Sequence, residues 1–557
     1  MDNQDRPRGG LTRRNVLRAS AAAFAAQALP RDGVASGTAT HARGAVFEDI
    51  DGSGIRHRDC AGIAGVMVSN GHDVTLTDSN GSWQLPVSDG DSIFIIKPSH
   101  WSLTGPTAGI PRFSYLHQSS GSPDKIRLRH GEGTPTNALP RSIDFALRRL
   151  PEATQFDVLL VADTQPGSDE ELEFVRDSLL ARVIDSEAAF AIHHGDVVGD
   201  RLDLYRRYAR MLEKTGMVWH HCPGNHDLNL DAADPRFSLE TWKRVFGPPH
   251  YAFQHGGVTF IMLNNVDYFG AGYRGGGRPY RGLIGQRQLA FVANVLKHVP
   301  PEQLVVVSMH IPLVNFEAPD NPADITVDRA QILSLLSDRP HSVSFSGHSH
   351  TTEHHMLDHR HGFTRSEPHH HQVLTAACGS WWSGPRNQSG VPVAISRDGS
   401  PKGFHILSVD GNSYRTRFVA ADAYEPPQLR LLVAQRSHET SNWQIGCQVC
   451  CNDLPIARVF VDVFDARPTT RVQLEIDGTH SCRLDMERTF VSNPLVEDFF
   501  NQYRHLCRPW VEAAPSSHLW SINLPQTLPP GIHKVTARVF TDHGQEIAEH
   551  LLLEISA

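Results

Sequence analysis

The sequence predicts a layered α/β domain flanked on each side by a β-sandwich. Between about Ile143 and Phe418, apolar β-rich runs alternate with helical patterns, which is typical of buried strands covered by helices. From about Arg43 to Leu128, short apolar runs are separated by turn residues without a helical period, as in a sheet built of hairpins. After Tyr414 the helical signal fades and strand patterns return. These patterns divide the chain into three folded domains.

The composition fits a globular protein and makes metal chemistry the first hypothesis. A prior of roughly 150 residues per domain allows about three or four domains in a chain of 557 residues. The net charge of −9 is modest, and no long Lys/Arg run occurs beyond the extreme N-terminus, so nothing indicates a nucleic-acid scaffold. The 33 His residues concentrate between His193 and His371, and imidazole is a common metal ligand.

The N-terminus resembles a twin-arginine export leader. Arg13 and Arg14 precede a mildly apolar run from Ala19 to Leu29, in which Ala26-Gln27-Ala28 is a plausible cleavage site. The run is too short and too weakly apolar to span a bilayer stably, which disfavours the alternative of a membrane anchor. We expect residues 1–42 to be a signal peptide with a polar tail. The mature protein is then exported, periplasmic or secreted, with no membrane span and an oligomeric state that the sequence leaves open.

Residues 43–130 are predicted to form a β-sandwich that resembles the immunoglobulin-like modules of bacterial surface proteins. Asn70-Gly71 between alternating runs is a strong hairpin signal. The loop Asp49–Gly54, with Asp59 beyond it, resembles a calcium loop, but Cys60 stands where a bidentate Glu would close it. The alternatives for this loop are a Ca²⁺ site and a plain polar turn.

The central domain is assigned to residues 143–420, after a linker rich in Gly, Thr and Pro at 131–142. Apolar residues recur at helical spacing in Glu170–Ile184 and Leu202–Leu212. Strands are expected at Phe156–Ala162, Phe190–His193, Met217–His220, Val258–Leu263, Leu304–Met309 and Val343–Phe345.

Residues 421–557 are predicted to form a second β-sandwich with a short helix near Val496–Tyr503. Disulfides are permitted in an exported protein, and one or two bridges are expected in the last third of the chain. A zinc site at Cys447 and Cys450 is the alternative, although no second pair follows at a suitable spacing. The cysteines of this region are Cys447, Cys450, Cys451, Cys482 and Cys507.

Polar residues of the central domain fall just after the predicted strands. Ligands collect at the carboxyl ends of strands in α/β sheets because several loops converge there. Two metal ions a few ångströms apart need a shared carboxylate to offset their repulsion, and imidazoles to complete each shell. Asp196 is the natural bridge, and Gly195, Gly224 and Gly347 fit turns where the backbone passes close to the ions. The donors are Asp163, Gln165, Asp196, Asn225, His310, His348 and His350.

The order of these motifs resembles the calcineurin-like metallophosphoesterase superfamily. The motifs are Asp-x-Gln, Gly-Asp, Gly-Asn-His-Asp, an isolated His and Gly-His-Ser-His, each after a strand. The resemblance implies a central four-layer α/β/β/α metallophosphoesterase sandwich flanked by the two β-sandwich domains. It implies a first metal held by Asp163, Gln165, Asp196 and His350, and a second held by Asp196, Asn225, His310 and His348.

Gln165 departs from the family pattern, which usually has His at this position. A neutral amide oxygen binds first-row metals less tightly than imidazole, so the first metal site is expected to be the weaker one. Members with flanking β domains also carry Asp-x-Gln, and Gln165 is therefore interpreted as a subfamily feature. The two ions are expected to be divalent Mn, Zn, Fe or Mg.

The resemblance implies an exported binuclear phosphoesterase that hydrolyses phosphomonoesters or phosphodiesters by attack of a metal-bridging hydroxide. His226 would contact the phosphate and donate a proton to the leaving group, and Asp227 would orient His226. The alternative is a non-catalytic metal-binding or scaffold protein whose first metal site is degenerate through Gln165.

Further segments have two interpretations each. Trp381, Trp382 and Arg386 would bind substrate, or the two Trp would form a packed corner. The stretch Tyr268–Arg281 is a substrate-side loop or a surface loop, and Cys222 and Cys378 are expected to be buried beside the site. A His-rich stretch is expected to be a solvated loop, with metal loading as the alternative; it comprises His354, His355, His359, His361 and His369–His371.

Overall fold

The computed structural model describes residues 40–105, 108–122, 128–131, 133–422, 428–437, 439–440, 442–477, 483–542 and 544–557. The chain divides into two compact units, Met1–Thr40 and His41–Ala557, and the second is described by itself. The predicted export leader lies almost wholly outside the described residues. Within the described part of the chain, no helix combines the length and apolarity needed to cross a membrane.

The N-terminal domain is a sandwich of two four-stranded sheets. One sheet has the order β4-β1-β8-β6 and the other β3-β2-β5-β7. Trp83 and Leu85 alternate with exposed residues along β4 and point into the sandwich. The bounds are β1 (His41–Glu48), β2 (Met67–Ser69), β3 (Val74–Leu76), β4 (Ser82–Pro86), β5 (Ser92–Ile96), β6 (Trp101–Leu103), β7 (Ser114–Leu116) and β8 (Phe145–Arg149).

Strand β8 shifts the boundary between the first two domains. Residues from 143 onward were assigned to the central domain, yet β8 pairs in parallel with β1 and antiparallel with β6. The chain therefore crosses the linker at 131–142, returns to the N-terminal sandwich and enters the central domain only after Arg149.

The acidic loop of this domain has the hydrogen bonds of a polar turn. Asp49 accepts the backbone N–H groups of Gly52 and Gly54 through its two carboxylate oxygens, each at 3.0 Å. Asp51 accepts the N–H of Ser53 at 3.0 Å. Among the described residues, a group of three acidic or His side chains close enough together to hold a metal ion occurs elsewhere, and no such group occurs in this loop. Ca²⁺ binding here stays a prediction.

Two stacked sheets form the centre of the molecule. A five-stranded sheet has the order β11-β10-β9-β20-β21, and a six-stranded sheet has the order β12-β13-β16-β17-β19-β18. The first contains β9 (Gln155–Val161), β10 (Phe190–His194), β11 (Trp219–Cys222), β20 (Gly403–Asp410) and β21 (Ser413–Ala420). The second contains β12 (Tyr251–His255), β13 (Val258–Met262), β16 (Val305–Ser308), β17 (Ser342–Ser346), β18 (Glu353–Leu357) and β19 (His369–Val373).

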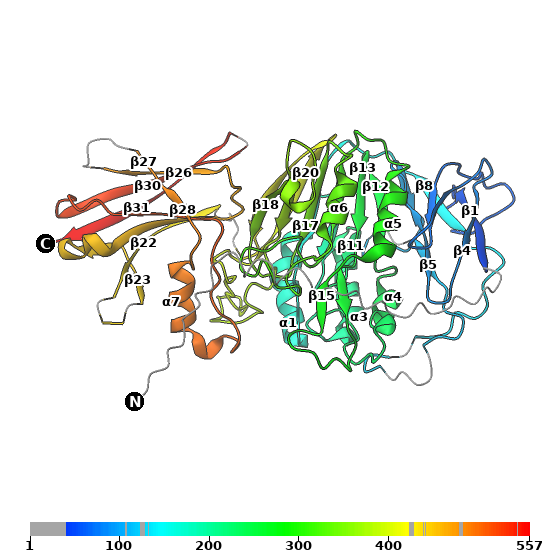
Figure 1. The fold of residues 1–557 in the computed structure, drawn as a ribbon, viewed down its shortest axis with the longest axis horizontal. Helices are drawn as coiled ribbons and strands as arrows, with labels where there is room; N and C mark the ends of the chain where they lie inside the picture. The colour runs from blue at the N-terminus through cyan, green and yellow to red at the C-terminus, as the bar shows by residue number, and fades with distance from the viewer. Residues whose placement is uncertain are drawn as a thin grey trace, which may run out of the picture. The chain divides into compact units, whose positions relative to one another are not determined.

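Helices cover the outer faces of the two sheets, which makes four layers. Along β9, Val158 and Leu160 belong to the core between the sheets, whereas Leu159 and Val161 belong to the core under the helices, as the alternation of strand side chains requires. Figure 1 shows the helices beside the sheets. They are α1 (Asp169–Phe174), α3 (Tyr205–Leu212), α5 (Gly285–Leu296) and α6 (Arg329–Leu336). The predicted α/β class with flanking β domains is confirmed.

Local sequence explains where α1 begins. Ser168 caps the helix by accepting the N–H of Glu171 at 3.1 Å. The Glu171 carboxylate in turn accepts the N–H of Gly167 at 2.7 Å. The first bond satisfies one N–H group that the helix start leaves free, and the second fixes the residue before the cap. Together the two bonds anchor the helix directly after the loop that carries Asp163 and Gln165.

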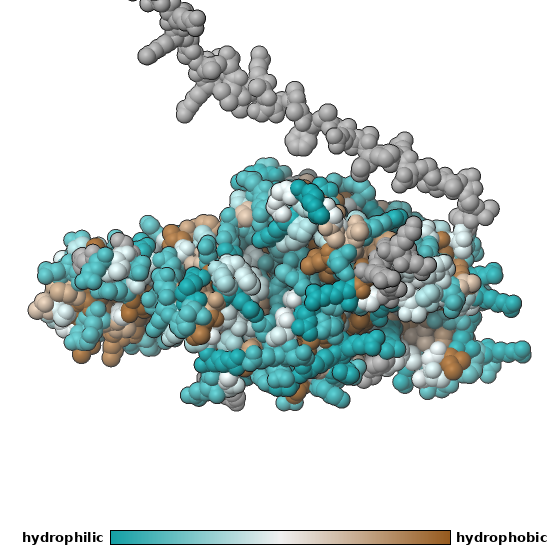
Figure 2. Space-filling view, turned by 90° about the horizontal axis from the view of Figure 1, so that it is seen from below, coloured by the Kyte–Doolittle hydropathy of each residue, from teal (hydrophilic) through white to brown (hydrophobic). Residues whose placement is uncertain are grey.

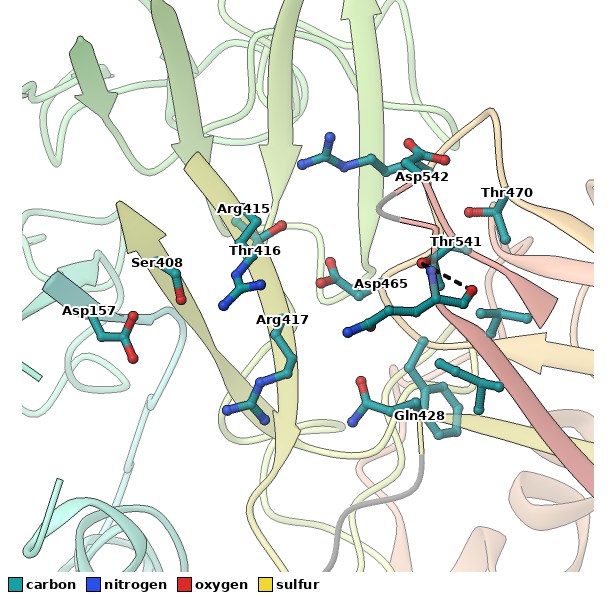
Figure 3. Close-up of a pocket in the computed structure, with 16 residues that line it drawn as sticks. Asp157, Ser408, Arg415, Thr416, Arg417, Gln428, Asp465, Thr470, Thr541 and Asp542 are labelled. Atoms are coloured by element: carbon teal, nitrogen blue, oxygen red, sulfur yellow. Dashed lines mark hydrogen bonds between the residues drawn. The ribbon is translucent and has the colours of Figure 1, made fainter. Parts of the chain in front are cut away.

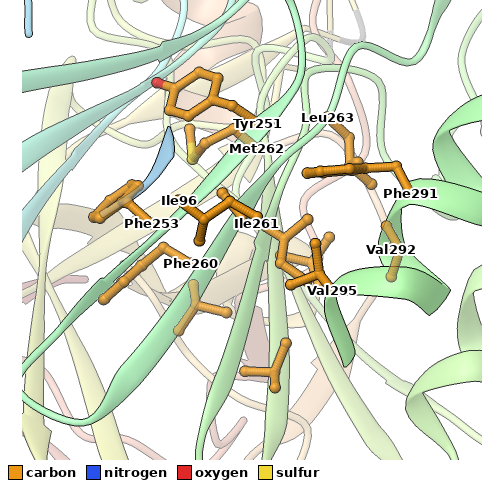
Figure 4. Packing of buried hydrophobic residues seen from close by; sticks show 14 of the residues in the cluster. Ile96, Tyr251, Phe253, Phe260, Ile261, Met262, Leu263, Phe291, Val292 and Val295 are labelled. Atoms are coloured by element: carbon orange, nitrogen blue, oxygen red, sulfur yellow. The ribbon is translucent and has the colours of Figure 1, made fainter. Parts of the chain in front are cut away.

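One apolar core joins the N-terminal sandwich to the central domain. Figure 4 shows Ile96 of β5 close to Phe253 and Phe260 of the six-stranded sheet, with Phe291 of α5 nearby. Phe94 of the same sandwich meets Phe291 edge-on, with ring centroids 5.8 Å apart. These contacts bury apolar area on both domains, so the N-terminal sandwich is an integral part of the fold.

The C-terminal domain is a sandwich of two five-stranded sheets, β23-β22-β25-β29-β28 and β24-β31-β30-β26-β27. The predicted short helix is α7 (Pro494–Gln502), which Asn493 caps and which has Pro at its first position. The strands are β22 (Leu429–Arg436), β23 (Trp443–Ile445), β24 (Gln448–Cys450), β25 (Ala457–Val463), β26 (Arg471–Ile476), β27 (Leu484–Asp485), β28 (Glu487–Thr489), β29 (Leu519–Asn523), β30 (Gly531–Phe540) and β31 (Glu546–Ser556). Figure 2 shows a mainly hydrophilic surface with scattered hydrophobic residues.

The expected disulfides are absent from the described part of the chain. Its seven cysteines are free, and Cys482 lies outside the described residues. Cys447 and Cys450 gain no further His, Cys or acidic group close enough to form a metal cluster among the residues described. The second sandwich is instead held together by its apolar core.

The His-rich stretch is not a solvated loop, and this expectation was wrong for most of its members. His354 and His355 lie in β18, and His369–His371 form the start of β19, all buried. His359 and His361 lie in a short 3-10 helix outside the sheet. The buried rings form hydrogen bonds with protein groups instead of water. His354, for example, contacts Asp465 of the C-terminal domain at 2.8 Å.

Asp465 is a shared partner of several of these buried polar side chains. It accepts the Gln372 amide N–H at 2.7 Å and lies 3.4 Å from the His405 ring. Burial raises the pKa of Asp465, but His405 and the hydrogen bond from His354 outweigh burial and hold it well below its ordinary value. The carboxylate is therefore ionised whenever the protein is folded near neutral pH.

Replacing Asp465 by Ala is expected to destabilise the protein by about 1–3 kcal/mol, because it leaves the buried polar groups of His354 and Gln372 without their hydrogen-bond acceptor. The urea unfolding midpoint measures the loss. Asp485→Ala is the matched control, since Asp485 is exposed and contacts Gln473 at 2.8 Å. Equal midpoints for the two variants would contradict the assigned role of Asp465.

Candidate metal centre

The predicted ligands come together where parallel strands of both sheets end. Asp163 follows β9, Asp196 follows β10 and Asn225 follows β11. His310 follows β16 and His348 follows β17 in the other sheet. Because the carboxyl ends of these strands share one rim, loops from both sheets meet there.

Four acceptor atoms converge at the centre of this rim. His310 Nε2 lies 3.1 Å from Asn225 Oδ1, 3.3 Å from Asp196 Oδ2 and 3.2 Å from His348 Nδ1. One ligand atom each from Asp196, His310 and His348 falls within a 4.8 Å cluster. These are the residues predicted for the second metal.

Backbone carbonyls fix which ring nitrogen of each His faces the centre. His310 Nδ1 donates to the carbonyl of His194 at 2.9 Å, and His348 Nε2 donates to that of Ala323 at 3.1 Å. A carbonyl oxygen only accepts, so the proton sits on these nitrogens. The opposite nitrogens then present lone pairs to Asn225 and Asp196, as in metal sites whose His ligands are held from behind.

His350 offers a further free lone pair. Its Nδ1 donates to the carbonyl of Gly379 at 2.7 Å. Its Nε2 is buried, lacks a hydrogen-bond partner and lies 3.8 Å from Asp163 Oδ1. A buried nitrogen without a partner is costly, and a metal ion between it and Asp163 would satisfy it. The donor set therefore fits a metal at the first position.

The Gln165 side-chain amide lies against Asp196, beside the predicted first metal position. Its Nε2 donates to Asp196 Oδ2 at 2.5 Å, while its Oε1 lies 3.7 Å from Cys378 Sγ. A half-turn of the amide exchanges these two atoms and turns the oxygen toward Asp196. Cys222 and Cys378 are both buried, and Cys378 lies beside Gln165 and His350. Burial raises the pKa of the Cys378 thiol well above its usual value.

The backbone at the site is held in an uncommon conformation. Positive φ values occur at Asp163 (54°), Gln165 (39°), Asp196 (54°), His348 (78°) and His350 (56°). Non-glycine residues avoid this region, at a cost of about 1–3 kcal/mol each, and such residues cluster at functional sites. Five of the seven predicted ligands share this feature.

Two glycines allow the loops to approach the ligands closely. A Cβ atom at Gly224 would lie 2.1 Å from Asp196 Oδ1, and one at Gly347 would lie 2.4 Å from Asp163 Oδ2. No side chain fits at either position without moving a carboxylate.

His226 is oriented by Asp200 rather than by Asp227. Its Nδ1 lies 2.8 Å from Asp200 Oδ1, and its backbone N–H donates to Asp196 Oδ1 at 2.9 Å. Burial lowers the pKa of His226, but the charges of Asp196 and Asp200 outweigh burial and raise it to about 9. The half-exposed ring is therefore a proton donor near neutral pH.

Asp227 has a structural place. Its carboxylate accepts the backbone N–H groups of Val197 at 3.1 Å and Gly224 at 2.8 Å, and the Tyr205 hydroxyl at 2.9 Å. It thereby ties together the two loops that carry Asp196 and Asn225. The adjacency of Asp227 to His226 in the sequence suggested a direct contact that the turn geometry does not make.

The three residues proposed for substrate contacts have different surroundings in the structure. The Trp381 ring stacks on His350, with centroids 3.9 Å apart. Trp382 is 4% exposed and donates its indole N–H to the carbonyl of Thr164 at 2.7 Å, so it forms the packed corner. Arg386 pairs with Glu170 at 2.8 Å.

Arg278 brings a cation to the rim. It lies between β14 (Val266–Tyr268) and β15 (Tyr280–Gly282), in the stretch considered as a substrate-side loop. Its Nη1 contacts Asp324 at 2.6 Å and lies 3.4 Å from His348 Nε2. No motif singled out Arg278 or Asp200, although Asp200 follows Asp196 closely within a Gly-containing loop.

A rim of carboxylate, amide and imidazole donors at the ends of two stacked sheets defines the chain as a metal-dependent enzyme. The model of the calcineurin-like phosphoesterase family matches residues 156–352. The models of the N-terminal and C-terminal domains of calcineurin-like phosphoesterase match residues 51–128 and 371–546. The chain belongs to the calcineurin-like phosphoesterases, and it is a metal-dependent hydrolase of phosphoric esters.

Solved structures include a purple acid phosphatase from yellow lupin (Lupinus luteus) seeds that is similar to this chain. The two share 10% sequence identity with a TM-score of 0.36, over 65% of this chain and 68% of the other. A search of curated proteins gave no match.

Replacing Gly224 by Ala is expected to lower the metal content per chain, because the new methyl group displaces the Asp196 carboxylate. Metal analysis of the purified protein measures the effect. Gly446→Ala is the control, since nothing lies within 4 Å of a Cβ at that position. Full metal content in Gly224→Ala would contradict the assignment of Asp196 as a shared ligand.

Proposed function

We propose that the protein is an exported phosphoesterase with two divalent metal ions. Asp163, Gln165, Asp196 and His350 would hold the first ion. The convergence of carboxylate, amide and imidazole ligand atoms around His310 Nε2 carries the proposal, because acceptors packed this closely repel one another unless a metal ion or a proton lies between them. The second ion would take Asp196, Asn225, His310 and His348.

When loaded, the metal centre would supply positive charge, which stabilises phosphate oxygens and lowers the pKa of a bound water. The donors are oxygen and imidazole nitrogen, a set compatible with Mn, Zn, Fe or Mg. Export is supported by Arg13 and Arg14 of the N-terminal leader. Cell fractionation tests it, by comparing the tagged full-length protein with the variant that combines Arg13→Lys and Arg14→Lys.

The protein's own side chains supply a proton and a phosphate contact. His226, held by Asp200, is half exposed and protonated near neutral pH, so it can donate to the leaving alkoxide of an ester. Arg278 presents its guanidinium beside His348, where it can bind a phosphate oxygen. These roles suit phosphomonoesters and phosphodiesters alike.

Asp196→Ala and Asn225→Ala are expected to abolish hydrolysis of p-nitrophenyl phosphate and of bis(p-nitrophenyl) phosphate. Either variant with full activity would overturn the proposed metal centre. Paired assays of the two esters by wild-type protein also distinguish monoesterase from diesterase activity.

His226→Ala is expected to lower kcat about 10²–10⁴-fold on an alkyl phosphate, as loss of a general acid does. The loss should be smaller on p-nitrophenyl phosphate, whose leaving group needs no proton. Asp200→Asn should show the same dependence on the leaving group with a smaller loss. An equal loss on both substrates would argue against proton donation by His226.

A scaffold protein with a degenerate first site is the second candidate, and the neutral amide of Gln165, a weaker metal ligand than imidazole, favours it. Gln165→His replaces the amide by a stronger ligand and is expected to raise the Mn²⁺ content per chain and shift the metal preference. Metal analysis and turnover under added Mn²⁺ are measured together. Less than one ion per chain and no turnover in the wild type would support the scaffold.

A further inference from the structure

A cavity of about 350 Å³ lies between the edge of the five-stranded sheet and the C-terminal sandwich. Figure 3 shows Arg415 and Arg417 of β21 on one side, with Asp465, Thr541 and Asp542 across from them. The volume falls in the roughly 300–1,000 Å³ range of small-molecule sites. The remaining polar lining includes Asp157, Ser408, Thr416, Arg467, Thr470 and Gln545.

The cavity lies apart from the metal centre. Asp157 lines it near the start of β9, whereas Asp163 follows the end of that strand. Six residues at about 3.3 Å per residue place the two roughly 20 Å apart along the strand. A ligand in the cavity would therefore not touch the metal ligands.

Three arginines line the cavity without an ion-pair partner. Arg415 and Arg417 are exposed on the same face of the edge strand β21, because side chains two residues apart in a strand point the same way. Arg467 approaches from the C-terminal domain. Within the described residues, none of the three forms a salt bridge, and Arg467 Nη2 is buried without a hydrogen-bond partner.

The carboxylates around the cavity are engaged elsewhere or too distant. Asp465 is occupied by His354 and Gln372. Asp542 accepts the Thr469 hydroxyl at 2.5 Å. Asp157 pairs in register with Ser408, which pairs in turn with Arg415, so a strand separates Asp157 from the guanidinium. No carboxylate of the described residues pairs closely with any of the three guanidinium groups, so their N–H groups are available to an anion in the cavity.

We propose that this cavity binds a small phosphate-bearing anion between the central domain and the C-terminal sandwich. The guanidinium fork matches the geometry of phosphate oxygens with two parallel hydrogen bonds. The hydroxyls of Thr470 and Ser408 are further donors at its wall. The ligand is free inorganic phosphate or the phosphate group of a small organic ester, since both carry the same oxygens. The site is independent of the phosphoesterase reaction.

Calorimetric titration of the full-length Asn225→Ala protein tests the proposal, because that background impairs phosphate binding at the metal centre. Inorganic phosphate and phenylphosphonate, which resists hydrolysis, are the two probes. At least one is expected to bind, and adding Arg415→Gln with Arg417→Gln should weaken that binding at least tenfold. Tighter binding of phenylphosphonate supports an organic phosphate, and binding of phosphate alone supports the free anion.

Arg206→Gln in the same background is the control, since Arg206 is exposed on α3, away from the cavity. It should leave both affinities unchanged. Arg467→Gln probes the cavity from the C-terminal side, and thermal melting without phosphate verifies that each variant folds. Absence of binding by both probes, or equal affinities with and without the arginine substitutions, would overturn the proposal.

Discussion

The structure depends on holding mutually repelling acceptors at one point. Asp196 Oδ2, Asn225 Oδ1 and His348 Nδ1 all lie at about hydrogen-bonding distance from His310 Nε2. Such an arrangement persists only because rigid strands fix the loops and because carbonyl groups hold the rings from behind. The positive φ angles of the ligand residues have the same origin: the surrounding layers impose a backbone that these residues would otherwise avoid.

The strand pattern and the motif spacing predicted most of the fold and the rim at which the proposed ligands meet. Each donor directly follows an apolar run, and strand ends converge in any α/β sheet, so Asp163, Asp196 and Asn225 could be placed without coordinates. Asp200 and Arg278 could not, because their partners are set by the three-dimensional path of loops. The buried histidines of β18 and β19 were misjudged for another reason: the polar groups that satisfy them, such as Asp465, come from a distant part of the chain.

The two accessory domains are attached by different kinds of chemistry. The N-terminal sandwich shares an apolar core with the central domain. The C-terminal sandwich is joined to it by smaller apolar clusters and, in addition, by buried charges, since His518 bridges Asp398 at 3.0 Å and Asp462 at 2.7 Å. Burial lowers the pKa of His518, but the two carboxylates outweigh burial and raise it to about 10. A polar junction of this kind specifies one geometry, because any displacement leaves a charge unpaired.

The position of Asp465 along the chain has a consequence for how the protein is made. His354 and Gln372 belong to the edge of the central sheet, yet their shared partner is synthesised about a hundred residues later. Arg508, which contacts Glu171 at the start of α1, is synthesised later still. During synthesis from the N-terminus, these polar side chains of the central domain therefore lack their partners until most of the last third of the chain has left the ribosome. A chain stopped short of that point would carry every metal ligand and still leave His354 and Gln372 without their shared partner.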